Sequence, residues 1–233
     1  MNKDKINIKN FFKNDFYNEI LVPIHKAGYP FIFIFFVFSL FLGALSDFLG
    51  WIGLILTAWC VYFFRDPIRV VPKDKNLIIS PADGKVLKVS VENPPEEFNS
   101  KRKLNKLSIF MNVFNVHVNR IPFSGTISEL KYIPGTFFNA SLDKSSKENE
   151  RMCIKLEISK NKYIYLVQIA GLIARRIKCD LEKNQKVETG EKFGIIRFGS
   201  RVDIYVPEEI KFSVVEGQTL IGGESIVAQI RDV

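Results

Sequence analysis

Residues 195–204 read IIRFGSRVDI, and this stretch decides how the second half of the chain is interpreted. Apolar and polar residues alternate through it, which predicts a β-strand. One face of that strand consists of Ile196, Phe198, Ser200, Val202 and Ile204. Two residues do not suit a buried strand, because Gly199 weakens a strand interior and Ser200 puts a hydroxyl on the apolar face. The Gly-Ser pair therefore indicates a purpose other than packing.

Short apolar runs of the same kind continue on both sides of this stretch. From about Leu77 onward, runs such as GKVLKVSV, LSIFMNVFNVHV and KYIYLVQIAGLI are bounded by turn-forming residues, which predicts strands joined by turns. Three segments, DGKVLKV, VETGEKFGIIR and VEGQTLIGGESIVAQI, each pair a Gly-centred turn with a β-branched strand, as biotinyl and lipoyl carrier domains do. The sequence predicts a mainly β (α+β) fold, with a barrel-sandwich-hybrid-like domain over residues 67–233.

An apolar block precedes this domain. Between Phe31 and Phe64 the only charged residue is Asp47. One helix of that length would run roughly 50 Å, more than the ~30 Å hydrocarbon core of a bilayer, whereas two helices turning near Asp47 would each run roughly 24 Å. We expect residues 27–66 to form a membrane-anchoring helical hairpin, either spanning or re-entrant, after a basic or amphipathic tail over residues 1–26. The alternative, a buried hairpin in a soluble core, would need a larger domain to cover it.

The charge and composition of the chain limit the kinds of partner that it is expected to bind. The formal net charge of +8 favours an anionic partner, and beside an apolar block an acidic membrane is a simpler choice than nucleic acid. Basic residues flank the block on both sides, so the positive-inside rule places both flanks and the β domain on the cytoplasmic side of the cell membrane. We expect no secretory signal peptide, because the first 26 or so residues are polar and no small-residue cleavage site follows the apolar block.

Few residues can do chemistry. Two histidines and three scattered cysteines give no metal-ligand spacing, so we expect no metal. GxGxxG, P-loop and GxSxG motifs are absent. His117, in FNVFNVHVNRIP, is the only histidine outside the anchor region, and it is either structural or a general base. Asp83 stands in ISPADGKV, where a turn alone would account for an aspartate.

Together these segments resemble a known family. YFFRDPIRVVP, ISPADGKV, IFMNVFNVHVNRIP, PGTFFNASLDKSSKENER, VQIAGLIARRI, GEKFGIIRFGSRVDIYVP and GQTLIGGESIVA look like the short-form phosphatidylserine decarboxylases, over essentially the whole chain. The Gly-Ser of RFGSR corresponds to that family's self-cleavage site. The longer bacterial members have a second histidine three residues before the one matched by His117, and Phe114 stands there in this chain. That departure leaves open which group performs the second proton transfer.

The resemblance implies an enzyme, a carboxy-lyase that converts phosphatidylserine to phosphatidylethanolamine and CO₂. It implies that Ser200 Oγ attacks the carbonyl of Gly199, that the chain is cut there, and that Ser200 becomes a covalent pyruvoyl cofactor that forms a Schiff base with the substrate. His117, with an ordinary pKa near 6.5, is the implied base, and Asp83 orients it. The β chain (1–199) and α chain (200–233) would form a heterodimer, with further oligomerisation open.

Four arginines are candidates to meet the lipid headgroup: Arg120, Arg175, Arg176 and Arg201. The alternative for each of them is an ordinary charged residue at the protein surface. Three alternatives stay open at this point. One is a decarboxylase of a related, archaetidylserine-type lipid, and another is a decarboxylase of a soluble amino acid, which the apolar hairpin disfavours. The last is a non-enzymatic, membrane-tethered barrel-sandwich module, for which the hairpin turns lack the usual carrier lysine pattern. The sequence does not reveal the lipid backbone or the acyl preference.

Overall fold

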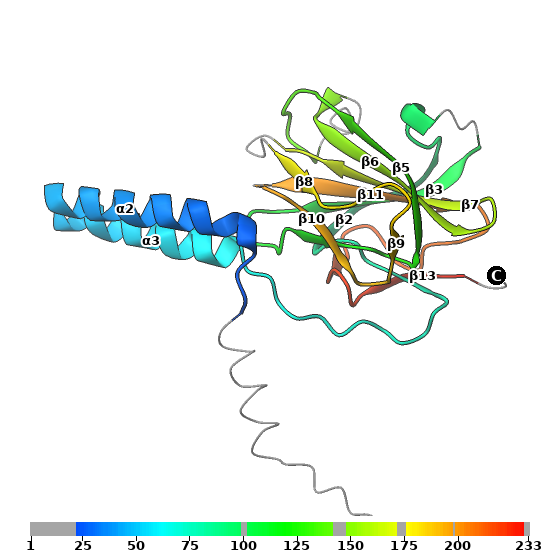
Figure 1. The fold of residues 1–233 in the computed structure, drawn as a ribbon, viewed down its shortest axis with the longest axis horizontal. Coiled ribbons are helices and arrows are strands. Elements are labelled where there is room, and N and C mark those ends of the chain that lie inside the picture. The colour runs from blue at the N-terminus through cyan, green and yellow to red at the C-terminus, as the bar shows by residue number, and fades with distance from the viewer. Residues whose placement is uncertain (1–21, 99–101, 142–147, 172–175, 198, 231–233) are drawn as a thin grey trace, which may run out of the picture. The chain divides into compact units, whose positions relative to one another are not determined.

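The computed structural model describes residues 22–98, 102–141, 148–171, 176–197 and 199–230. The chain divides into two compact units, Met1–Ile68 and Arg69–Val233, and each is described by itself. Figure 1 shows the two kinds of structure, which are a pair of long helices and a curved β domain.

The first unit contains the predicted helical hairpin. A short 3₁₀ helix, η1 (Lys26–Gly28), leads into α2 (Tyr29–Leu45), and α3 (Asp47–Phe63) follows after a single extended residue, Ser46. The two helices pack through small residues. A Cβ atom on Gly50 would lie 2.8 Å from the Cα atom of Gly43, so the backbones approach too closely for a side chain there. The predicted hairpin is confirmed, and its turn lies beside Asp47.

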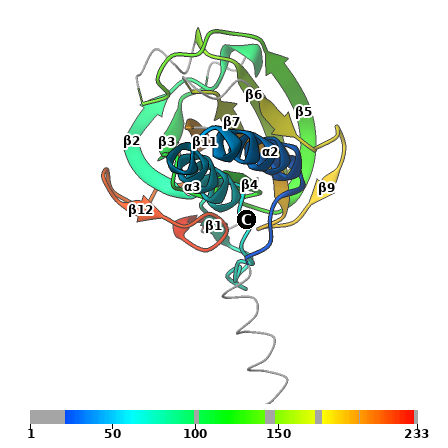
Figure 2. The same cartoon turned by 90° about the vertical axis from the view of Figure 1, so that its left-hand side faces the viewer.

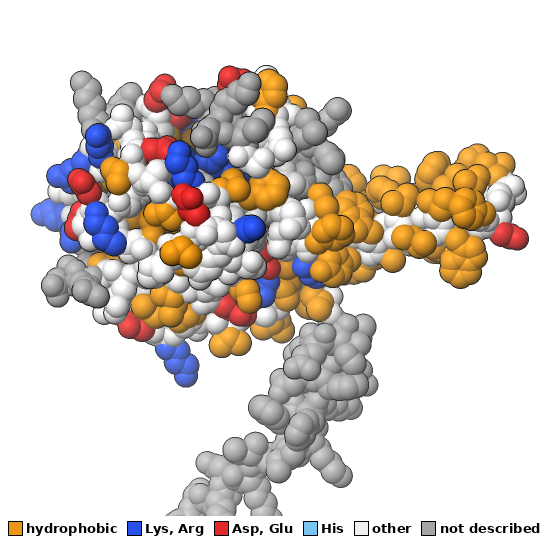
Figure 3. Space-filling view, turned by 180° about the vertical axis from the view of Figure 1, so that it is seen from behind, with side chains coloured by type: hydrophobic (Ala, Val, Ile, Leu, Met, Phe, Trp, Pro, Cys, Tyr) orange, Lys and Arg blue, Asp and Glu red, His pale blue; other side chains and the backbone are white. Residues whose placement is uncertain are grey.

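The outer surface of this hairpin is apolar. Phe33, Phe48 and Trp51 are each about two-thirds exposed or more, and orange side chains cover the helices in Figure 3. The segment Lys26–Leu45 is long and apolar enough to cross a membrane, whereas α3 is shorter. A large exposed apolar surface of this kind marks an interaction with a membrane or another protein.

The second unit is built on one large curled sheet. Within the described residues this sheet has eight strands in the order β12-β2-β3-β11-β7-β6-β5-β9, and Figure 2 shows them curving as an open half-barrel. The bounds are β2 (Gly84–Glu92), β3 (Leu104–Met111), β5 (Gly125–Ile133), β6 (Arg151–Ser159), β7 (Lys162–Ile169), β9 (Lys186–Val187), β11 (Ser200–Pro207) and β12 (Thr219–Leu220). In a smaller sheet, β10 (Lys192–Ile196) lies between β4 (Val118–Arg120) and β8 (Ile177–Cys179). In another, β1 (Leu77–Ile79) pairs with β13 (Ile226–Gln229). The predicted mainly β class is confirmed.

Strand β11 lies at the centre of the large sheet. It pairs antiparallel with β3 on one side and with β7 on the other. Val202, Ile204 and Val206 face the main apolar core, while Tyr205 belongs to a second apolar cluster. The chain just after Gly199 is therefore fixed by two strand neighbours and buried on both faces.

The prediction of one continuous strand over residues 195–204 is wrong. Strand β10 ends at Ile196 in one sheet, and β11 begins at Ser200 in another. Between them Gly199 has a φ of +69°, a left-handed conformation that favours glycine. The alternating pattern conceals this break, because the residues on both sides of it suit strands. Phe198 lies outside the described residues.

Candidate functional site

The Gly-Ser pair lies where the chain passes from β10 to β11. Ser200 is fully buried as the first residue of β11. Its Oγ atom has no hydrogen-bond partner among the residues that the structure describes. A buried hydroxyl without a partner costs about 1–3 kcal/mol, so a protein that keeps one requires a reason.

His117 faces the peptide N–H of Gly199, one peptide bond before the Gly199–Ser200 bond. Its imidazole is fully buried, and Nε2 accepts a hydrogen bond from the backbone N–H of Gly199 at 3.3 Å. On the other side of the ring, Nδ1 lies 2.9 Å from the carbonyl oxygen of Asn115. A carbonyl accepts hydrogen bonds, so the contact assigns the proton to Nδ1 and leaves the lone pair on Nε2. The structure thus brings His117 and Gly199, both predicted site residues, into contact and points a neutral, basic nitrogen at the Gly-Ser junction.

A tight turn before His117 holds in place the Asn115 carbonyl, which is the partner of the His117 ring. The backbone N–H of Asn115 donates to the carbonyl of Asn112 at 3.0 Å, and the side-chain oxygen of Asn115 accepts from the N–H of Asn112 at 2.9 Å. Phe114 lies at this turn and is 60% exposed. The same turn therefore presents the Asn115 carbonyl inward to His117 and the Phe114 ring outward, where longer relatives of the resembled family have a histidine.

Gly171 is a site residue that the sequence analysis missed. A Cβ atom on Gly171 would lie only 2.0 Å from the carbonyl oxygen of Gly199. Glycine is therefore required at position 171 if the Gly199 carbonyl is to keep its place. The quoted segment VQIAGLIARRI contains this glycine just after β7, which is the signal that could have pointed to it.

Buried polar side chains lie on the same face as Ser200. Met111 is the register partner of Ser200 on β3, and the amide nitrogen of Asn119 lies 3.6 Å from its sulfur. The Gln168 side chain donates to Asn119 Oδ1 at 2.8 Å, while Gln168 Oε1 is buried without a hydrogen-bond partner in the described part of the chain. Ser200 and Gln168 lie on the neighbouring strands β11 and β7, so the unused Gln168 oxygen is an acceptor for a hydrogen-bond donor that reaches residue 200. Gln168 was also missed by the sequence analysis.

Asp83 is held by residues from two other parts of the chain. Its carboxylate pairs with Arg69 at 2.7 Å and accepts the backbone N–H of Gly222 at 2.8 Å. The backbone N–H of Arg120 donates to the carbonyl of Pro81, which ties this turn to β4, the strand that begins one residue after His117. Asp83 therefore lies on an element connected to the His117 strand, and its orienting role stays a prediction.

Two of the four predicted headgroup arginines are occupied inside the fold. Arg201 is 2% exposed and pairs with Asp203 and with Ser108. Arg120 is buried, and its guanidinium donates to the carbonyl of Gly190 at 3.0 Å. Arg175 lies outside the described residues. Arg176 is exposed just before β8.

Arg197 is a basic residue near the junction that the sequence analysis did not single out. It is half-buried and directly follows β10. Burial and the neighbouring positive charge of Arg176 both lower the pKa of Arg197. The site therefore has two guanidinium groups close together on the approach to Gly199.

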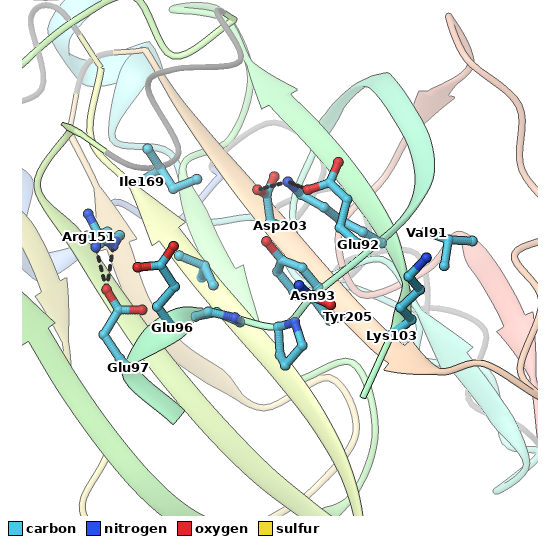
Figure 4. Close-up of a pocket in the computed structure, with 14 residues that line it drawn as sticks. Val91, Glu92, Asn93, Glu96, Glu97, Lys103, Arg151, Ile169, Asp203 and Tyr205 are labelled. Carbon is cyan, nitrogen blue, oxygen red and sulfur yellow. Dashed lines mark hydrogen bonds and ion pairs between the residues drawn. The ribbon is translucent and has the colours of Figure 1, made fainter. Parts of the chain in front are cut away.

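A separate cavity of about 480 Å³ lies on the other face of the large sheet (Figure 4). Lys106 lies between the carboxylates of Glu92 and Asp203, at 2.8 Å and 3.3 Å. Arg151 pairs with Glu97 at the same cavity. Because its lining residues include neither Ser200 nor His117, this cavity is not the candidate active site.

Other nucleophiles and metal ligands do not compete with Ser200. Burial, together with the charge of Glu97, raises the pKa of Cys153 to about 12, so its thiol stays protonated at neutral pH. Burial also raises the pKa of Cys179. Within the residues that the structure describes, no group of His, Cys, Asp and Glu could hold a metal ion.

Comparison with known proteins places the chain in one family. A family model described as phosphatidylserine decarboxylase matches residues 56–228. A protein of Rickettsia akari (strain Hartford) named phosphatidylserine decarboxylase proenzyme is 53% identical over 213 residues, which cover 91% of this chain and 92% of that protein. Proteins of the same name from Rickettsia rickettsii (strain Sheila Smith) and Rickettsia typhi (strain Wilmington) are 53% and 51% identical, with the same coverage of both chains.

Proposed function

The chain belongs to the phosphatidylserine decarboxylase family, and from that membership we propose that it is a proenzyme that cuts itself between Gly199 and Ser200 and then decarboxylates phosphatidylserine. The observation that supports self-cleavage most directly is the contact of His117 Nε2 with the N–H of Gly199, next to a Ser200 hydroxyl that is buried without a partner in the described residues. The base then lies one peptide bond before the scissile Gly199–Ser200 bond, and the nucleophile directly follows that bond, so the two groups are neighbours, as nucleophilic catalysis requires.

Self-cleavage follows from the chemistry of these residues. Ser200 Oγ attacks the Gly199 carbonyl carbon, and the peptide nitrogen leaves, which converts the amide to an ester. Removal of the Ser200 α-proton then expels the Gly199 carboxylate from Cβ. The resulting dehydroalanine takes up water, loses ammonia and becomes a pyruvoyl group. His117 is the proposed base for the α-proton, and Asp83, through its turn, is proposed to orient His117.

A pyruvoyl group at residue 200 would supply a carbonyl for the substrate amine and would accept the electrons left when CO₂ departs. Gln168 Oε1 is buried without a hydrogen-bond partner in the described residues, and as an acceptor it fits an N–H of the substrate amine. Asn119 Nδ2, which lies 3.6 Å from the Met111 sulfur, is the donor proposed to hold a carbonyl oxygen at residue 200, and His117 is proposed to hold or return the proton. Ladder pairing of β11 with β3 and β7 would keep the α chain (200–233) bound to the β chain (1–199) after the cut.

Gly171→Ala tests the position of the scissile carbonyl. The added methyl group would lie 2.0 Å from the Gly199 oxygen, so that oxygen has to move. We expect cleavage to slow by about a hundredfold, because displacing a reacting atom by about 1 Å costs that much. The fraction of cut chain is followed by denaturing electrophoresis after synthesis.

Gly125→Ala is the matched control for this variant. Its Cβ would lie 2.3 Å from the carbonyl oxygen of Glu157, a similar clash on strands remote from Ser200. It should destabilise the fold to a comparable degree and leave cleavage near the wild-type rate. Equal cleavage in the two variants would show that Gly171 does not position the Gly199 carbonyl.

The hairpin is proposed to bring the enzyme to its lipid substrate. Its exposed apolar surface suits a bilayer, and the basic residues on both flanks support a cytoplasmic location for the β domain. A membrane-bound enzyme meets a bilayer lipid at a higher effective concentration than a dissolved one.

The decisive experiment measures CO₂ release from phosphatidylserine by the full chain and by a chain lacking residues 1–66. We expect the full chain to release CO₂ from vesicles. The deletion should lower that rate by about a hundredfold through lost effective concentration. Activity on short-chain, water-soluble phosphatidylserine should fall much less.

The ratio of the two rates identifies what the hairpin does. An unchanged ratio would mean that the hairpin does not present substrate. Loss of self-cleavage in the shortened chain would mean that the hairpin is part of the catalytic fold and that the proposed boundary near residue 66 is wrong. A full chain that releases no CO₂ from either substrate would contradict the proposed function.

A further inference from the structure

Two arginines meet at the end of a strand pair next to the cleavage site. Strands β8 and β10 are antiparallel, and their register pairs Ile177 with Ile196. One step further along the same register, Arg176 falls opposite Arg197. Directly opposed like charges destabilise a strand pair, and burial together with the positive charge of Arg176 lowers the pKa of Arg197.

The surroundings leave one of these charges available. Arg176 is exposed, and with the described part of the chain it makes no hydrogen bond and no ion pair. Glu150, which contacts the residue after Arg176, is 5% exposed and accepts the backbone N–H of Ile177 at 3.1 Å. Arg176 also lies close enough to lower the pKa of Tyr132, which Glu150 raises. Its guanidinium therefore faces a surface that a ligand can reach.

The separation between Arg197 and Ser200 is compatible with the separation between the amine and the phosphate of a lipid headgroup. Arg197 precedes Ser200 by three residues, so their Cα atoms lie within about 11 Å even in an extended chain. In phosphatidylserine only a few bonds separate the reacting amine from the phosphorus atom. A phosphate next to Arg197 would thus be compatible with an amine at residue 200.

We propose that Arg176 and Arg197 together bind the phosphodiester of the phospholipid substrate. The assignment rests on the proposed function, because it takes the reacting amine to lie at residue 200. Arginine suits this role, since its planar guanidinium donates paired hydrogen bonds to phosphate oxygens. A phosphate between two opposed arginines would also remove the repulsion between them. Arg120 and Arg201 are occupied within the fold, so this pair replaces them as the headgroup contact.

The test compares Arg176→Gln with Arg102→Gln in the full chain. Both residues are exposed, and both substitutions remove one positive charge, so they weaken general attraction to anionic lipid equally. Arg102 lies at a different surface, near Tyr163. With phosphatidylserine in mixed micelles, Arg176→Gln should raise KM at least about tenfold relative to Arg102→Gln, with kcat changed little. Arg197→Lys should raise KM as well, because lysine keeps the charge and loses the paired donors.

Soluble inhibitors identify the group that is bound. Glycerophosphoserine has the phosphodiester without acyl chains, and O-alkylserine has the amino acid and an apolar chain without phosphate. Arg176→Gln should weaken inhibition by glycerophosphoserine about tenfold and leave inhibition by O-alkylserine unchanged. Inorganic phosphate should inhibit the wild type only weakly, whereas inhibition as strong as that by glycerophosphoserine would mean a site for free phosphate and would contradict the lipid assignment.

The remaining outcomes also decide the question. An active enzyme in which Arg176→Gln and Arg102→Gln have the same KM would overturn this assignment and leave the proposed function intact. An Arg176→Gln chain that fails to cut itself would place Arg176 in processing and would overturn its role in substrate binding. A wild-type chain that stays whole and inactive would overturn the proposed function, and this assignment with it.

Discussion

Ser200→Ala should give a folded, uncut and inactive chain, whereas the wild type should separate under denaturing conditions into chains of residues 1–199 and 200–233. The substitution removes the only atom proposed to attack the Gly199 carbonyl, so neither the cut nor the pyruvoyl group can form. Intact-mass measurement would find one chain in the variant and two in the wild type. The smaller wild-type chain should resist N-terminal sequencing, because a pyruvoyl group has no amine.

The stability of this variant should change little, and the change should be favourable if there is one. The Ser200 hydroxyl is buried without a partner in the described residues, so its removal relieves a cost on the order of 1 kcal/mol. Urea unfolding checks this expectation. Ser213→Ala is the matched control, because it removes a hydroxyl that does have a partner, the carbonyl of Val227, and it should still cut normally. A Ser200→Ala chain that is cut at the same peptide would end the pyruvoyl proposal.

Local patterns predicted the elements around the site well, because they depend on neighbours in sequence. Period-two alternation identified the strands, and an uncharged block too long for one span indicated the hairpin, which the structure has as α2 and α3. The break between β10 and β11 was missed because hydrophobic periodicity does not report a single φ angle. Only the glycine at position 199 marked it.

Contacts between distant segments could not be predicted from one sequence. Gly171 is required by the carbonyl of Gly199, yet the two residues meet only after β7 and β11 have paired. Arg201 shows the same limit. The sequence named it as a headgroup candidate, whereas alternation points its side chain to the face opposite Ser200, where Asp203 and Ser108 hold it. A charged residue next to a reacting residue on a strand therefore belongs to the other side of the sheet.

His117→Ala is expected to slow self-cleavage by about 10² to 10⁴-fold, the usual contribution of a general base. The structure gives the reason, because Nε2 faces the N–H of Gly199 while the Asn115 carbonyl holds the proton on Nδ1. The cut fraction is measured over time by electrophoresis. His25→Ala is the matched control, since it removes the other histidine of the chain in the helical unit and should cut at the normal rate.

Rescue by free imidazole separates a chemical role of His117 from a structural one. The ring is fully buried, so alanine leaves a space that imidazole can fill, and a base that acts by proton transfer should be partly restored. A structural role would give a destabilised chain that imidazole does not restore. Normal cleavage of His117→Ala without imidazole would assign the proton transfer to another group, and the contact with Gly199 would then serve only to hold the peptide in place.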